Sequence, residues 1–121
     1  MPNKRTVVIG ASNNPERYAY KAVLSLVAKG QEVFPVGIRN GQIGNIQIVT
    51  DRDIYENIDT VTLYVGPQNQ PDWYEYILAL QPKRIIFNPG TENQELMQLG
   101  KNKNIEIVEA CTLVMLSIGN Y

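Results

Sequence analysis

A short polar stretch near the N-terminus has the residue types of a phosphate-binding loop. A run of apolar, mostly β-branched residues is followed by Gly10, Ala11, Ser12 and Asn13. A helical pattern begins just beyond, and a small-residue turn that opens a helix presents backbone N–H groups at the positive end of the helix dipole. We therefore predict that these four residues contact a phosphate, with the Ser12 hydroxyl as an additional donor.

The loop departs from the full dinucleotide-binding fingerprint, G-x-G-x-x-G, because Ser12 stands in place of the second glycine. A plain turn without a ligand is the alternative, with Asn14 as the N-cap and Pro15 as the first helical residue. Arg17 and Tyr18 come next, at the start of the predicted helix. Arg17 would add positive charge beside a phosphate. A solvated arginine and a half-buried tyrosine are the simpler interpretation of this pair.

The end of the second apolar run indicates which nucleotide such a site would take. Residues 32–36 have the composition of a strand, and Gly37 and Arg39 follow them. NAD sites carry an acidic residue at this place, which binds the ribose hydroxyls, and this chain has none there. A cation suits a ribose that carries an extra phosphate, as in NADP or coenzyme A. The alternative is a surface arginine in a turn.

The rest of the chain alternates between apolar runs and helical patterns, which predicts the elements that position these residues. Strands are expected over residues 6–9, 32–36, 60–65, 84–87 and 105–109, and helices over residues 17–29, 51–58, 71–80, 91–100 and 112–118. Asp51 is the expected N-cap of the second helix, and Thr91-x-x-Gln94 has the form of a capping box. Turn signals within residues 40–50 indicate a short hairpin-like excursion.

This alternation predicts an α/β fold, a three-layer open parallel sheet of about five strands with helices on both faces. In such a sheet the strands end at one common edge, and ligands bind outside that edge, where the strand order reverses. The loops after the third and fourth predicted strands therefore join the site. They add Val65, Gly66, Pro67, Asn88 and Gly90 to the candidate binding residues.

The composition limits the classes to which the protein can belong. The 121 residues, 44% of them hydrophobic and 19% charged, predict a single globular domain over residues 1–121. A formal net charge of −1 gives no general attraction to nucleic acid or to an anionic membrane. No apolar run has the length of a membrane span, and we expect no signal peptide. Cys111 is the only cysteine, which excludes an intrachain disulfide and favours a cytoplasmic location.

The chain contains no histidine. This excludes Ser–His and Cys–His nucleophiles, a phosphohistidine and the usual His-ligated metal sites. We predict no catalytic and no metal-ligating residue. Cys111 is expected to act as a small buried hydrophobic residue rather than as a reactive thiol.

Several stretches, in order and at matching intervals, resemble the small single-domain CoA-binding proteins, which are similar to the N-terminal domain of the succinyl-CoA synthetase α subunit. These stretches are Val8–Tyr18, Gly30–Val36, Asp53-Ile54, Gly66-Pro67, Asn93-x-Glu95 and Glu109-Ala110-Cys111. The resemblance implies a Rossmann-like fold that holds the ADP part of coenzyme A. It implies that Gly10–Asn13 contact the pyrophosphate, that Arg17 and Tyr18 flank it, and that Arg39 replaces a family lysine near the ribose phosphate.

We therefore expect a domain that binds coenzyme A or an acyl-CoA and has no evident catalytic machinery. The closing helix, residues 112–118, carries apolar residues on several faces, which predicts a homodimer that buries this helix or the Trp73–Leu78 face. Two alternatives stay open: an NADP-binding oxidoreductase-like domain, and a ligand-free interaction module on the same fold.

Overall fold

The computed structural model describes all of residues 1–121 and is built around a sheet of five parallel strands. Their order across the sheet is β2 (Val33–Val36), β1 (Thr6–Ile9), β5 (Thr60–Leu63), β6 (Arg84–Phe87) and β7 (Glu106–Glu109). β1, β5 and β6 are buried at every position, as expected of strands covered on both faces. The strand order reverses between β1 and β5. The predicted Rossmann-like α/β fold is confirmed.

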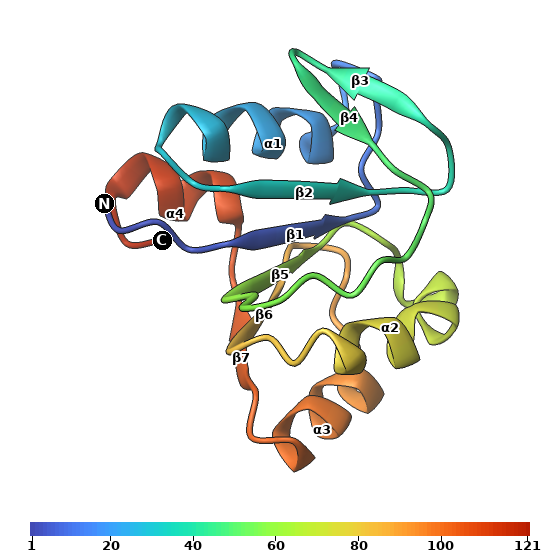
Figure 1. The fold of residues 1–121 in the computed structure, drawn as a ribbon. Coiled ribbons are helices and arrows are strands. Elements are labelled where there is room, and N and C mark those ends of the chain that lie inside the picture. Colours follow the sequence, from blue (N-terminus) through green and yellow to red (C-terminus); the bar gives the residue numbers. More distant parts are fainter.

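Two helices cover each face of the sheet (Figure 1). One face carries α1 (Tyr18–Ala28) and α4 (Thr112–Ile118), and the other carries α2 (Tyr74–Ala79) and α3 (Gln94–Asn102). Two short 3₁₀ turns, η1 (Pro67–Asn69) and η2 (Pro71–Trp73), lead into α2. The sequence predicts a buried stripe of Ala19, Ala22, Val23, Leu26 and Val27 on α1. The first four are buried, but Val27 is 44% exposed, so the prediction is wrong for that residue. None of the helices has the length and apolar character needed to cross a membrane.

A small antiparallel hairpin lies between β2 and β5 in the chain. It consists of β3 (Gly41–Ile43) and β4 (Ile46–Ile48), which confirms the hairpin-like excursion expected there. Ile43 and Ile48 are buried in the cluster that also holds α1 side chains. The hairpin therefore extends the helical layer beside α1 toward the carboxyl edge of the sheet (Figure 1).

The helix predicted over residues 51–58 is wrong. The segment is irregular, with bends at Asp51, Glu56 and Asn57. It connects the hairpin to the start of β5 and is held by tertiary contacts along the way. The Tyr55 ring stacks on Phe34 with a centroid distance of 4.4 Å, and Arg52 forms an ion pair with Asp72 at 3.1 Å. These side chains meet partners from distant parts of the chain, which outweighs a weak local helical pattern.

The capping box at Thr91 is also wrong. The N-cap of α3 is Asn93, whose Oδ1 accepts hydrogen bonds from the N–H groups of Glu95 and Leu96. The Thr91 hydroxyl instead donates to the Asn88 carbonyl oxygen at 2.8 Å. The predicted helix over residues 71–80 is correct in place, but its first residues form a 3₁₀ turn and α2 begins at Tyr74.

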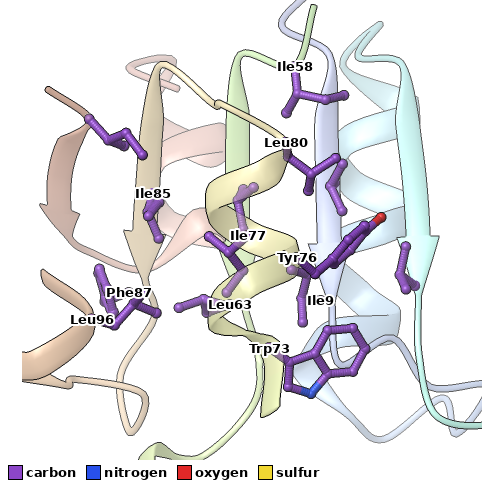
Figure 2. Close-up of a cluster of buried hydrophobic side chains, with 14 of the residues drawn as sticks. Ile9, Ile58, Leu63, Trp73, Tyr76, Ile77, Leu80, Ile85, Phe87 and Leu96 are labelled. Carbon is purple, nitrogen blue, oxygen red and sulfur yellow. The ribbon is translucent and has the colours of Figure 1, made fainter. Parts of the chain in front are cut away.

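The face of α2 that carries large apolar side chains packs on the sheet. Figure 2 shows Trp73 and Ile77 directed at the strands, in the cluster that includes Ile9, Leu63 and Ile85. Trp73 is 3% exposed and Ile77 is fully buried. The Trp73–Leu78 face therefore belongs to the core of the chain, and the expectation that it is a free dimer surface is wrong.

Candidate functional site

The loop between β1 and α1, residues 10–17, lies at the carboxyl edge of the sheet where the strand order reverses. Gly10 has a φ of 91°, and a Cβ there would lie 2.7 Å from the Tyr64 carbonyl oxygen. Glycine therefore allows the chain to leave β1 in close contact with the end of β5. The N–H groups of Gly10 and Ala11 both donate to the Val36 carbonyl oxygen, at 3.0 and 3.1 Å. These two residues shape the loop, and their N–H groups are already occupied.

The backbone N–H groups further along the loop are unoccupied. Those of Ser12 and Asn13 have no acceptor within the chain. The Ser12 hydroxyl oxygen accepts from the Asn14 N–H at 3.1 Å, so its hydrogen remains available to an external acceptor. A negatively charged group placed above this turn would meet two backbone donors and one hydroxyl.

The start of α1 adds more donors of the same kind. Arg17 is its N-cap and provides no side-chain cap, so the N–H groups of Tyr18, Ala19 and Tyr20 have no acceptor. The plain-turn alternative has Asn14 as the cap and Pro15 as the first helical residue. Asn14 Oδ1 does accept from the Glu16 N–H at 3.0 Å, but α1 begins only at Tyr18, so this bond closes a turn within the loop and leaves the first N–H groups of α1 without an acceptor. An uncapped helix start at a ligand-binding edge favours an anion.

The loop after β2 lies against the loop after β1. A Cβ on Gly37 would lie 2.6 Å from the Ala11 carbonyl oxygen, and one on Gly41 would lie 3.1 Å from the Asn13 side chain. Gly37 therefore permits a close approach of two backbones. Arg39 lies between these two contact points, is exposed, and takes part in none of the three ion pairs of the chain. Arg39 is thus a cation without an ion-pair partner beside the β1–α1 loop.

Arg17 is likewise exposed and outside the ion pairs. A third arginine, which the sequence did not single out, differs from these two. The Arg52 guanidinium stacks over the Trp73 ring at 3.7 Å and binds Asp72 through both its main-chain oxygen and its carboxylate. Its charge and donors are already used. Arg17 and Arg39 are the two arginines that remain free for a ligand.

The loops after β5 and β6 contribute unequally to this edge. Val65, Gly66 and Pro67 are partly exposed, and the Val65 side chain lies against Gly10. Asn88 is only 2% exposed, and its side chain is fully occupied: it donates to Thr62 Oγ1 and the Leu63 carbonyl and accepts from the Thr112 N–H. Asn88 therefore ties α4 to the sheet.

Gly90 is exposed, with a φ of 93° that suits glycine in this turn. Its N–H donates to the Glu92 carboxylate at 2.8 Å. This donor is therefore shared with an anionic side chain, which distinguishes it from the free N–H groups of the β1–α1 loop.

One buried residue at this edge was not foreseen. Gln70 is fully buried between η1 and η2, where it bonds to the Val65 and Thr91 carbonyl oxygens and to the Asn93 side chain. The segment Pro67–Pro71 carries no pattern that predicts burial of a polar residue. The burial of Gln70 becomes evident only from the three-dimensional packing of the two loops around its amide.

Two further residues follow strands at this edge: Tyr64 comes directly after β5, and Cys111 lies between β7 and α4. Cys111 is half-buried at the N-cap of α4. The Tyr64 hydroxyl is buried without a hydrogen-bond partner. Burial raises the pKa of Tyr64 above its usual 10.0, although the nearby Thr112 and Thr62 hydroxyls oppose part of this shift. No cluster of His, Cys, Asp and Glu side chains in the structure could hold a metal ion.

The chain is similar to a protein family and to several solved structures. The family model of the CoA binding domain matches residues 4–117. A crystal structure of an uncharacterized protein aligns over the full length of both chains, with 48% identity and a TM-score of 0.97. A hypothetical protein from Pyrococcus horikoshii OT3 is 24% identical, with a TM-score of 0.86 over 96% of this chain and 83% of its own. No curated protein matches the chain.

A larger protein contains the same fold. In the dinucleotide-forming acetyl-coenzyme A synthetase 1 of Candidatus Korarchaeum cryptofilum, solved with phosphate and ADP, 26% of that chain aligns with 89% of this one. The identity is 14% and the TM-score 0.70, which shows a shared fold. The family model, by contrast, covers residues 4–117, which is nearly the whole sequence. The chain belongs to the CoA binding domain family.

Proposed function

We propose that the protein binds coenzyme A or an acyl-CoA at the carboxyl edge of the sheet, and that its role is binding rather than catalysis. The pyrophosphate would lie over the β1–α1 loop, against the N–H groups of Ser12 and Asn13 and those that open α1. Membership in the CoA binding domain family supports the ligand class. The observation that carries the proposal is the set of unoccupied backbone donors flanked by two unpaired arginines, Arg17 and Arg39.

The position of Arg39 supports coenzyme A over NAD. In folds of this type the ribose lies over the end of the second strand. Arg39 follows β2 and offers a planar set of donors suited to a ribose phosphate, and no acidic side chain is there to bind a free diol. NADP also carries a ribose phosphate, so the binding experiment must compare the two ligands.

Titration calorimetry with coenzyme A, dephospho-CoA, NADP and NAD tests this proposal. We expect coenzyme A to bind about tenfold more tightly than dephospho-CoA, which corresponds to about 1.4 kcal/mol for one arginine–phosphate contact. Arg39→Ala is expected to abolish that difference and leave dephospho-CoA nearly unaffected. Arg17→Ala is expected to weaken both ligands, since it would face the pyrophosphate that they share.

The matched control is Arg52→Ala, which removes an arginine already held by Asp72 and Trp73 and should leave all affinities unchanged. No binding of coenzyme A at millimolar concentration would refute the proposal, and tighter binding of NADP would favour the oxidoreductase-like alternative. Substitution of Gly10 is a poor test of the site. Any side chain there meets the Tyr64 carbonyl, so the fold would change before the ligand contact does.

We also propose a homodimer in which α1 and α4 form the interface. These helices lie side by side (Figure 1) and expose apolar side chains: Leu24, Val27, Val114 and Ile118. α4 has no charged residue and α1 has only Lys21, so two copies of this surface bring few like charges together. Light scattering is expected to give a dimer that Ile118→Glu dissociates. Ile38→Glu, at an exposed isoleucine of the carboxyl edge, is the control.

A further inference from the structure

The side chain of Gln70 joins the two loops that follow β5 and β6. Its Nε2 donates to the Val65 carbonyl oxygen at 2.9 Å and to the Thr91 carbonyl oxygen at 2.7 Å, and its Oε1 accepts from Asn93 Nδ2 at 2.9 Å. The residue is 0% exposed. Both hydrogens and the oxygen of a buried amide are therefore satisfied by three separate parts of the carboxyl edge.

The orientation of this amide is fixed by Asn93. The Asn93 Oδ1 is committed as the N-cap of α3, where it accepts from the N–H groups of Glu95 and Leu96. Its Nδ2 must then face outward, and it donates to Gln70 Oε1 and to the Tyr74 hydroxyl. A reversed Gln70 amide would place an oxygen against two carbonyl oxygens and an NH₂ group against another NH₂ group. The network therefore allows one arrangement.

This arrangement sets the direction of the peptide between Val65 and Gly66. All peptide bonds of the chain are trans, so the carbonyl and the N–H of this peptide point in opposite directions. The Val65 carbonyl faces the buried amide of Gln70, and the Gly66 N–H consequently faces away from it. That N–H has no acceptor within the chain. Val65 contacts the loop after β1, because its Cγ2 lies 2.9 Å from where a Cβ on Gly10 would be.

We propose that Gln70 is a positioning residue for the ligand, which holds the Gly66 N–H as a donor beside the β1–α1 loop. This inference rests on the proposed binding of coenzyme A. The strand order puts β2 and Arg39 on one side of β1 and β5 on the other. With the adenosine over β2, the Gly66 donor serves the second phosphate and the pantetheine arm, on the β5 side.

The experiment compares two ligands that differ in that half of the molecule. Adenosine 3′,5′-bisphosphate keeps the adenosine, the ribose phosphate and one 5′-phosphate, and lacks the second phosphate and the pantetheine. For Gln70→Leu we expect the affinity for coenzyme A to fall tenfold or more, with the affinity for adenosine 3′,5′-bisphosphate changed by less than twofold. A loss of stability alone would weaken both ligands by the same factor.

Gln31 provides a matched control at the opposite edge of the sheet. It is 5% exposed, its Oε1 accepts from the Lys4 N–H, and its Nε2 donates to the carbonyl oxygens of Pro2 and Lys29. Gln31→Leu thus removes an equivalent network away from the ligand edge. It should lower the melting temperature comparably and leave the ratio of the two affinities at its wild-type value.

A milder variant covers the case in which Gln70→Leu does not fold. Asn93→Ser keeps an N-cap oxygen for α3 and removes the donor that orients Gln70. It should therefore weaken coenzyme A more than adenosine 3′,5′-bisphosphate, but by a smaller factor than Gln70→Leu does. Equal fold-changes for both ligands, or the same split in Gln31→Leu, would overturn the positioning role while leaving coenzyme A binding intact. A wild-type protein that does not bind coenzyme A would overturn both proposals.

Discussion

The two faces of the sheet are held to their helices by different forces. On the face of α2 and α3 the buried side chains are almost entirely apolar and form one continuous cluster around Ile77, Phe87 and Leu96. On the other face, α1 and the hairpin rest on apolar residues, and α4 adds Met115 and Leu116 to the same apolar cluster. The strands beneath α4 also carry buried polar side chains, which are Thr6, Thr60, Thr62, Arg84 and Asn88, and α4 itself opens with the buried Thr112.

The buried polar side chains of the second face form two groups of hydrogen bonds. Asn88 bonds to Thr62 and to the backbone that opens α4, and the Thr62 and Thr112 hydroxyls share a hydrogen bond of 2.8 Å. At the other end, Arg84 donates to Thr60 Oγ1 and stacks on the Tyr121 ring at 4.5 Å. Apolar packing tolerates small shifts of a helix, but a network of directed bonds fixes one position. The comparison therefore indicates that directed hydrogen bonds fix the position of α4, whereas α2 and α3 are held mainly by apolar packing.

The largest effect is expected for Asn88→Leu on the polar side. The leucine fills a similar volume but leaves the Thr112 N–H and the Leu63 carbonyl buried without partners. Each such group costs about 1–3 kcal/mol, so we expect a loss of about 4 kcal/mol in the free energy of unfolding, measured by urea denaturation. Asn102→Leu, at an exposed asparagine of α3, should cost less than about 0.5 kcal/mol.

On the apolar side, Leu96→Ala is expected to cost about 3 kcal/mol, because it removes a fully buried side chain from a packed cluster. Ile38→Ala, at a position 79% exposed after β2 and outside the proposed dimer surface, is the control and should cost less than about 1 kcal/mol. If Leu96→Ala were far more damaging than Asn88→Leu, hydrogen bonding would not be the dominant force that holds α4, and the contrast between the two faces would fail.

The same contrast explains which parts of the fold the sequence predicts. Strands and helices with a strong apolar pattern, such as β1 and α1, lie where the pattern places them, because burial of apolar area decides their structure. Residues 51–58 carry a helical pattern as well, but contacts of Tyr55 and Arg52 with distant residues decide their course. Such partners are not visible in a local stretch of sequence.

The candidate site divides in a similar way. The place of the β1–α1 loop at the carboxyl edge could be predicted from the small residues that follow an apolar run. Arg17 and Arg39 could be singled out because each comes shortly after a predicted strand. Which N–H groups are free does not follow, because Gly10 and Ala11 use theirs on Val36 through a contact between two loops. Nor does the burial of Gln70, which depends on the spacing of the loops after β5 and β6.

A smaller effect is expected for Tyr121→Phe. The hydroxyl of Tyr121 shares a hydrogen bond of 2.6 Å with Thr6 Oγ1, while its ring and main-chain oxygen remain in contact with Arg84 in the variant. The loss of one buried bond should lower the free energy of unfolding by about 1 kcal/mol. Thr6→Val also removes the 2.7 Å hydrogen bond from Thr6 Oγ1 to the Lys4 carbonyl oxygen, so it should cost more than Tyr121→Phe. The double variant should show coupling between the two, measured by a double-mutant cycle. Strictly additive losses would show that the bond contributes nothing.

The smallest effect at neutral pH is expected for Tyr64→Phe, since the Tyr64 hydroxyl has no partner to lose. The free energy of unfolding at pH 7 should change by less than about 0.5 kcal/mol. The variant should nevertheless differ from the wild type in alkali. Burial raises the pKa of Tyr64 above 10.0 in the folded state, so above pH 10 the unfolded chain releases a proton that the folded chain retains. Stability is then lost by about 1.4 kcal/mol per pH unit from this group.

Tyr64→Phe removes that loss, so the variant should be more stable than the wild type at pH 11 by about 1.4 kcal/mol. Burial also raises the pKa values of Tyr76 and Tyr121, and a decline in alkali should therefore persist in the variant with a smaller slope. Urea denaturation at pH 7 and pH 11 measures both effects. Tyr18→Phe, at a tyrosine that is 68% exposed, should leave both values unchanged. An equal decline in wild type and Tyr64→Phe would mean that the hydroxyl reaches solvent or a hydrogen-bond partner, and that the polar layer beneath α4 is looser than its bond network implies.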